Sequence, residues 1–178
     1  MPRIPYPVLT EEQNKEYQKS GLNIAHMMFL MPPKIHAALG MAGRTLLFDS
    51  SYDAGLRELI ILRVGYLSKC AYEVHQHRAY GRKFGLTDEK IEAALTQSLT
   101  TPLSAREQAV LKFADEAIVN VRASDATLAA ARQYLVDSEI LETLAIIGTY
   151  MMIARVIETT AIELDAPGVI VGNPDLKK

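Results

Sequence analysis

Helix start and stop signals follow one another along the sequence, and they constrain the fold more than any other feature. Thr10 with Gln13, and Ser104 with Glu107, have the spacing of capping boxes, in which each side chain binds the backbone N–H of the other residue. Pro33 is suited to open a helix, because its missing N–H is not needed in a first turn. Only the short "GVIV" near the C-terminus has the character of a strand. The sequence therefore predicts an all-α fold, a bundle of about eight helices.

Further signals place the boundaries of the later helices. Gly85 supplies the left-handed turn that ends one helix, and Thr87 caps the next. Ser68 is expected to cap the helix that carries Cys70, which would then lie in the first turn. Ser138 is expected to begin a long last helix that reaches about residue 164.

The composition is that of one globular domain. The chain has 178 residues, of which 49% are hydrophobic and 22% charged. We therefore predict a single domain over residues 1–178, with a core at about residues 22–165 and a loop-like C-terminal tail.

Charge and hydropathy limit the classes of binding partner and the cellular location that can be expected for the protein. The net charge is −2, without a basic face, so nucleic acid is not an expected partner. The N-terminus lacks the apolar segment of a secretory signal, and the longest apolar run, Leu144 to Ala154, is too short to cross a bilayer. A single cysteine suits a reducing compartment. We expect a cytoplasmic protein with no membrane partner.

The last predicted helix carries "IIGTYMMIARV", which is apolar almost all round. Such a helix lies in a core or at a subunit interface, and we expect both roles together. The sequence therefore predicts a homo-oligomer that buries part of Leu141 to Ile157 between subunits.

Three groups able to carry chemistry share one face of a predicted helix. Cys70, Glu73 and His77 are spaced i, i+3 and i+7, so they fall within a stripe roughly 60° wide. Glu73 and His77 are an i, i+4 pair, close enough to hydrogen-bond. His75 points elsewhere, whereas Glu58, on the preceding antiparallel helix, can face the same stripe.

These residue types allow acid–base or thiol chemistry. A carboxylate beside an imidazole between apolar walls tends to have a pKa moved toward neutrality. A thiol in a first helical turn is stabilised as a thiolate, and it serves as a nucleophile or only as a polarisable wall. The alternative is structural: Cys70 as a small buried hydrophobe, Glu73 with His77 as a solvated helix pair, and Glu58 as a surface charge.

The segment "LRELIILRVGYLSKCAYEVHQHRAYGRKFGLTDEKIEAAL" resembles the carboxymuconolactone decarboxylase superfamily, which includes the alkylhydroperoxidase D proteins. Its "YEVHQH" matches the family's "YEWxxH" pattern, with Val74 in place of tryptophan, and the resemblance extends over roughly Leu22 to Ala123. It implies an alkylhydroperoxidase D-like helical bundle assembled as a trimer or hexamer.

The resemblance also assigns roles to residues. In the peroxidase branch a glutamate, a CxxC pair, a histidine between the cysteines and a second histidine form a proton relay. Glu58, Cys70 and His77 match the glutamate, the first cysteine and the second histidine. Tyr72 stands at the intervening histidine, and Glu73 replaces the second cysteine. A catalytic cycle that forms a disulfide within one subunit is therefore impossible. A cycle with one thiol, which passes through a sulfenic acid and is completed by an external thiol, is still possible.

The decarboxylase branch uses neither a metal nor an organic cofactor, and a carboxylate at position 73 suits it. The leading prediction is a cofactor-free lyase that performs acid–base chemistry on a small oxygenated acid or lactone. The alternatives are a one-cysteine peroxidase with peroxiredoxin activity and a non-catalytic helical oligomer that binds a small ligand. The candidate catalytic residues are Glu73, His77, Glu58 and Cys70, and the candidate substrate-binding residue is Tyr72.

Overall fold

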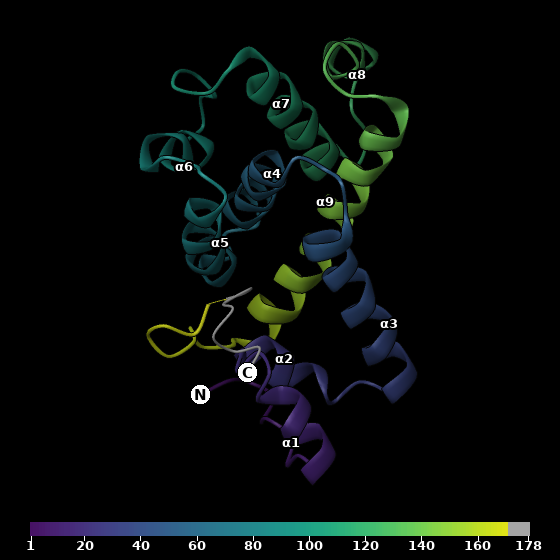
Figure 1. Cartoon of the computed structure of the whole chain (residues 1–178), viewed down its shortest axis with the longest axis vertical. Coiled ribbons are helices and arrows are strands. Elements are labelled where there is room, and N and C mark those ends of the chain that lie inside the picture. The colour runs from purple at the N-terminus through teal and green to yellow at the C-terminus, as the bar shows by residue number, and fades with distance from the viewer. Residues whose placement is uncertain (171–178) are drawn as a thin grey trace. The chain divides into compact units, whose positions relative to one another are not determined.

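The structure, a computed structural model, describes residues 1–170. Within that range it has nine α-helices, one π-helical turn and no strand (Figure 1), which confirms the predicted all-α fold. The elements are α1 (Glu11–Tyr17), α2 (Asn23–Met28), α3 (Pro33–Arg44), η1 (Thr45–Asp49), α4 (Ala54–Leu67), α5 (Ala71–Lys83), α6 (Asp88–Ala94), α7 (Ala105–Asn120), α8 (Asp125–Ala131) and α9 (Asp137–Thr160).

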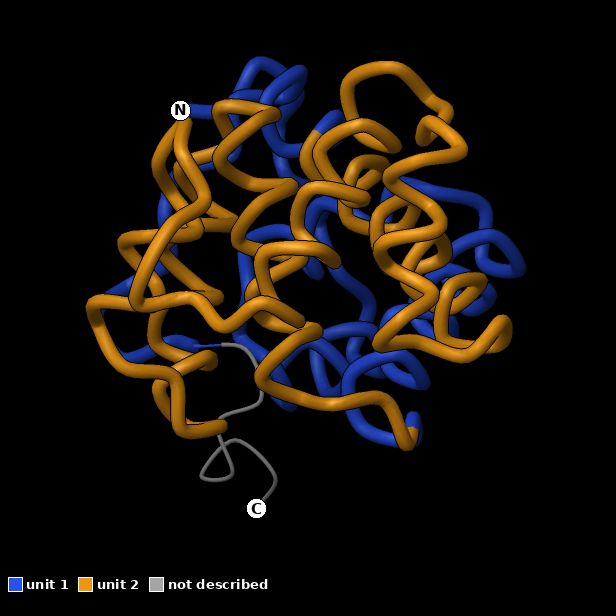
Figure 2. The backbone as a smooth tube through the Cα atoms, turned by 90° about the horizontal axis from the view of Figure 1, so that it is seen from above, with its two compact units in different colours: residues 1–50, 155–178 blue, residues 51–154 orange. Residues whose placement is uncertain are grey.

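The chain forms two compact units, one from residues 1–50 with the chain from residue 155 onward, the other from residues 51–154 (Figure 2). The single domain over residues 1–178 therefore stays a prediction. The expected loop-like tail has no helix in residues 166–170, and its remainder lies outside the described residues.

The first unit contains α1, α2 and α3, and the starts of α1 and α3 match the signals in the sequence. Thr10 and Gln13 form the predicted capping box at α1, with N···O distances of 3.2 and 2.9 Å. Pro33 occupies the first turn of α3, as expected. The backbone N–H of Asn23 donates to Oδ1 of Asp165 at 2.6 Å, which ties the start of α2 to the segment after α9.

Helix α4 is the centre of the second unit. Every residue from Leu56 to Gly65 is buried, and α4 packs against α5, α6 and α7 (Figure 1). Asp53 caps its N-terminus by accepting the Leu56 N–H at 3.0 Å. A helix buried on all sides explains the continuous apolar run around Glu58.

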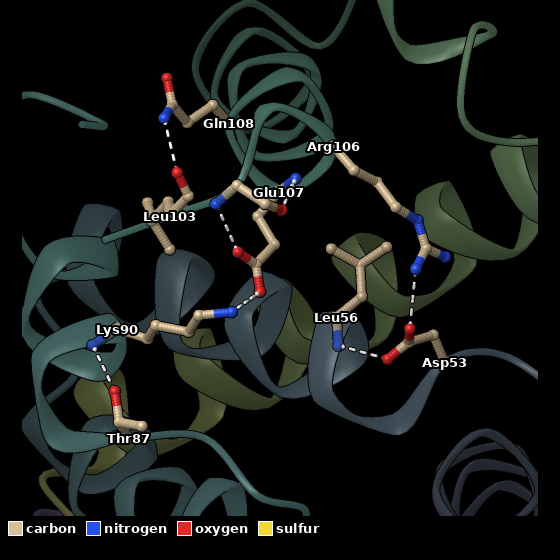
Figure 3. Close-up of polar contacts among 9 residues, drawn as sticks. Asp53, Leu56, Thr87, Lys90, Leu103, Arg106, Glu107 and Gln108 are labelled. Carbon is tan, nitrogen blue, oxygen red and sulfur yellow. Dashed lines mark hydrogen bonds and ion pairs between the residues drawn. The ribbon is translucent and has the colours of Figure 1, made fainter. Parts of the chain in front are cut away.

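Polar contacts fix the helices around α4 (Figure 3). Lys90 of α6 binds Glu107 of α7 at 2.7 Å, and Arg106 binds Asp53 at 2.8 Å. Glu107 also completes the predicted capping box with Ser104. Because the Asp53 side chain caps α4 as well, these contacts join the start of α4 to the start of α7.

The predicted start of α5 is wrong by two residues. Ser68 is the C-terminal cap of α4, and Cys70 is the N-cap of α5. Cys70 therefore lies before the first turn of α5 and not within it. The reason is a Schellman motif: the Cys70 N–H binds the Gly65 carbonyl at 2.8 Å and the Lys69 N–H binds the Tyr66 carbonyl at 3.1 Å. Lys69 takes the left-handed conformation, with φ 56°, that glycine usually supplies.

Helix α9 begins at Asp137 and ends at Thr160, four residues before the predicted end at about residue 164. The next residue, Ala161, has a left-handed backbone with φ 55°. The helix is long and apolar enough to cross a bilayer by length and composition, a test that core helices of soluble proteins also pass. The expected absence of a membrane partner stays a prediction. Within residues 51–154, the Tyr52 and Thr143 hydroxyls hydrogen-bond at 2.7 Å and fix this helix.

Candidate functional site

A buried carboxylate at the centre of α4 organises the site. Glu58 is fully buried, and each of its oxygens has a cationic or hydrogen-bonding partner. Oε2 lies 2.7 Å from Nδ1 of His77, and Oε1 accepts from Nε of Arg57 at 3.0 Å. A charge with hydrogen bonds to both oxygens is tolerated in an apolar interior, where an isolated charge is not.

Glu73 completes the cluster from the same helix as His77. Its Oε2 lies 3.4 Å from Nε2 of His77, one helical turn away. Both side chains are almost wholly buried. The imidazole therefore lies between two carboxylates, one from α4 and one from α5.

Gly65 permits the close approach of α4 and α5 at this point, and Gly81 permits the close approach of the segment after α5. A Cβ on Gly65 would lie 3.1 Å from the Cβ of Glu73 and 3.1 Å from Cγ2 of Val74. A Cβ on Gly81 would lie 3.1 Å from Cδ1 of Leu86. A larger residue at position 65 would therefore crowd α4 against α5, whereas at position 81 the tight contact is with Leu86, in the segment that follows α5.

Aromatic rings enclose the imidazole. Tyr150 of α9 stands edge-on to His77, with ring centroids 5.0 Å apart and an interplanar angle of 89°. Tyr80 makes a longer edge contact at 6.3 Å. Tyr150 was not predicted from the sequence, because nothing within α9 distinguishes it from the core residues of that helix.

Burial and neighbouring charges shift the protonation of these groups. Burial raises the pKa of Glu73 to about 7; the charge of His77 opposes the rise and that of Glu58 adds to it. Burial disfavours the charged form of His77, but the charge and hydrogen bond of Glu58 and the charge of Glu73 raise its pKa overall. Burial, with the charges of Glu73 and Glu58, raises the pKa of Tyr150 well above its ordinary value. The phenol therefore stays protonated.

The structure places the other two candidate residues at the start of α5. Cys70 is fully buried and contributes to the wall of a surface pocket, whereas Tyr72 is buried in the first turn of α5. The pocket has a volume of about 420 Å³, and Glu58, Glu73 and His77 are not among its lining residues. His75 lines it, on the face of α5 away from the carboxylates. The structure thus brings together Glu58, Glu73 and His77, with Cys70 at a neighbouring pocket.

Comparisons with known proteins agree with this architecture. Residues 33–116 match the sequence model of the Carboxymuconolactone decarboxylase family. No curated protein matches the chain significantly.

Solved structures share the fold at low sequence identity. An uncharacterized peroxidase-related protein from a Silicibacter species has a TM-score of 0.80 at 22% identity, covering 93% of this chain and 92% of that one. The alkylhydroperoxidase AhpD core of Ralstonia eutropha has a TM-score of 0.77 at 19% identity, with coverages of 99% and 94%. The debrominase Bmp8 has a TM-score of 0.76 at 16% identity, with coverages of 90% and 91%. Residues 33–116 thus resemble the carboxymuconolactone decarboxylase family, and the chain has the alkylhydroperoxidase D-like helical fold of these structures.

Proposed function

We propose that the protein is a cofactor-independent acid–base enzyme of the lyase type, acting on a small oxygenated acid or lactone. The observation that carries this proposal is the buried carboxyl group of Glu73. It has a pKa of about 7 and lies beside the imidazole of His77. A general acid–base group works best when its pKa lies near the working pH. Glu73 is then the group that gives or takes the proton of the substrate.

The remaining groups of the cluster support the proton transfer. Glu58 binds Nδ1 of His77 and so turns Nε2 toward Glu73, which sets the direction in which a proton moves. Arg57 holds the other oxygen of Glu58. In this proposal His77 exchanges the proton with Glu73, and Glu58 positions His77 and balances its charge.

Two observations favour acid–base over thiol chemistry. The position that carries the second cysteine in the peroxidase branch is Glu73 here, and a carboxylate cannot resolve a sulfenic acid. The side chain of Cys70 is fully buried, whereas a reactive thiol is usually partly exposed and in an electropositive environment.

A one-cysteine peroxidase is the second candidate, and the pocket is the observation that favours it. Cys70 contributes to the pocket wall together with Lys69 and His75, which are groups able to stabilise a thiolate. Two of the structures that share the fold are described as peroxidase-related. In this candidate Cys70 attacks the peroxide and an external thiol reduces the resulting sulfenic acid.

The two candidate functions predict opposite effects of the same substitutions on activity. We would assay decarboxylation of 4-carboxymuconolactone by proton NMR, and reduction of tert-butyl hydroperoxide with a dithiol as the external reductant. The variants are Glu73→Gln, His77→Ala and Cys70→Ser, with Glu89→Gln on α6 as a matched exposed control. Circular dichroism confirms that each variant is folded.

The lyase proposal expects a decarboxylase that loses roughly 10²- to 10⁴-fold in rate on Glu73→Gln or His77→Ala and little on Cys70→Ser. Peroxide reduction that Cys70→Ser abolishes and Glu73→Gln retains would replace it with the peroxidase. Inactivity of the folded wild-type protein in both assays would favour the non-catalytic binding protein.

A further inference from the structure

We propose that the pocket beside Cys70 is a binding site for a small organic anion with an apolar body. The pocket lies where α4 turns into α5, and its volume of about 420 Å³ falls in the range of small-molecule sites. Its lining comes from the end of α4, the turn, and the outer face of α5.

The charges around the pocket have one sign. Lys69, His75 and Arg78 line it, and none of the lining residues is acidic. Arg78 binds Glu92 through both terminal nitrogens of its guanidinium group. Lys69 takes part in no ion pair within residues 1–170, so its charge is available to a ligand, and His75 beside it can offer a ring nitrogen as a hydrogen-bond donor.

The backbone holds Lys69 in a defined position at the end of α4. Lys69 occupies the C′ position of the Schellman motif with φ 56°, a conformation that glycine adopts without steric cost. A non-glycine residue there is strained, as are Val121 and Ala161 at the ends of α7 and α9. At Lys69 this conformation places the residue in the wall of the pocket, where its side chain is exposed.

The rest of the wall suits the apolar body of the ligand. Ala71, Val74 and the ring of Tyr66 line the pocket, and the guanidinium carbon of buried Arg63 lies 5.1 Å from the centre of the Tyr66 ring. Arg63 is itself fixed by Asp115, with N···O distances of 2.5 and 2.8 Å. The Tyr66 ring is therefore held in place. A flat ring bearing one carboxylate satisfies both the apolar wall and the cations.

The pocket and the proton-transfer cluster share one neighbour, Gly65. Gly65 lines the pocket on one side, and on the other a Cβ at this position would meet the Glu73 side chain at 3.1 Å. That the bound anion is the substrate on which Glu73 acts rests on the proposed function. That an anion binds in the pocket does not depend on it.

Benzoate tests the binding, with benzamide as its uncharged counterpart. Both are titrated by isothermal calorimetry into the wild-type protein and into Lys69→Gln, Lys69→Gly and Lys112→Gln. Lys112 is an exposed lysine of α7 that does not line the pocket, so it is a matched control. Thermal unfolding of each variant is recorded in parallel, because glycine relieves the left-handed strain at position 69.

We expect saturable benzoate binding, at least five-fold tighter than that of benzamide and weakened by salt. Lys69→Gln and Lys69→Gly should each weaken it roughly three- to ten-fold, as for loss of one partly exposed ion pair. Lys112→Gln should leave it unchanged. Lys69→Gly should also raise the melting temperature, so that weaker binding in that variant cannot come from unfolding.

Equal affinities for benzoate and benzamide, no saturable binding, or an unchanged dissociation constant in Lys69→Gln would overturn the site. The anion site and the proton-transfer role of Glu73 can be disproved independently of each other. Loss of benzoate binding with a normal dependence of turnover on Glu73 removes only the pocket. Benzoate binding that depends on Lys69, in a protein whose turnover ignores Glu73, removes only the proton-transfer role.

Discussion

The imidazole of His77 bridges two carboxylates, with Nδ1 at 2.7 Å from Glu58 and Nε2 at 3.4 Å from Glu73. The shorter contact crosses from α5 to α4, and the longer one stays within α5. Glu58 also has Arg57 on its other oxygen, whereas the pKa of Glu73 is raised to about 7. A pKa near 7 suits the carboxyl group of Glu73 to exchange a proton near neutral pH.

The raised pKa of Glu73 makes the stability of the fold depend on pH. Between its ordinary value of 4.5 and about 7, the folded protein keeps a proton that the unfolded chain has released. Folding stability therefore falls as pH rises through this window, and the raised pKa of His77 acts in the same direction. In Glu73→Gln the loss of stability between pH 5 and pH 8 should be smaller by about 1–3 kcal/mol. Urea unfolding at the two pH values measures this difference, and parallel curves for the two proteins would contradict it.

Breaking the contact between Glu58 and its partners should be costly. Glu58→Ala leaves His77 and Arg57 buried without their carboxylate, and it opens a cavity in the central helix. We expect a loss of about 3–5 kcal/mol in unfolding free energy at pH 7. The exposed Glu89→Gln should leave the free energy of unfolding close to that of the wild-type protein. A loss below about 1 kcal/mol for Glu58→Ala would show that the cluster contributes little to the fold.

Tyr150 should hold the ring of His77 through its own ring and not through its hydroxyl. Tyr150→Phe keeps the edge contact at 5.0 Å, so the imidazole signals of His77 in NMR spectra should move little. Tyr150→Leu removes the ring and should shift and broaden these signals, with a stability loss of about 1–3 kcal/mol. Large changes in Tyr150→Phe would instead assign the role to the phenol hydroxyl.

The exposed face of α9 should mediate self-association. The side chain of Leu141 is 68% exposed and that of Leu144 is 40% exposed, and Ala145 and Gly148 extend the same face. The double variant Leu141→Lys with Leu144→Lys should convert the predicted oligomer into a monomer, as measured by light scattering after gel filtration. Val119→Lys, at an equally exposed position of α7, is the matched control and should leave the mass unchanged. A wild-type monomer at micromolar concentration would contradict the prediction.

Local signals predicted local structure, because a capping box or a proline acts within one helical turn. Both capping boxes formed as expected, and the i, i+4 spacing of Glu73 and His77 was enough to place them in contact. The contact of Glu58 with His77 depends on how two helices pack, so the sequence alone left it as one of several possibilities.

Two features had no local signal to predict them. A left-handed C′ residue is usually glycine, and with Lys69 there the end of α4 was not recognised, so Cys70 was placed in the wrong turn. Tyr150 reaches His77 from a helix more than 70 residues away in sequence, and no periodicity within α9 distinguishes it from core residues. Both errors concern long-range or strained positions, where packing overrides local preference.

The titration of Glu73 itself tests the central claim most directly. Protein labelled with ¹³C at the glutamate carboxyl carbons would be followed by NMR from pH 3 to pH 9, alongside Glu73→Gln. The account predicts one carboxyl signal with a midpoint near pH 7 that is missing from the variant. If every glutamate of the wild-type protein titrates below about pH 5, as ordinary glutamates do, Glu73 is not the proton-exchanging group and the acid–base account fails.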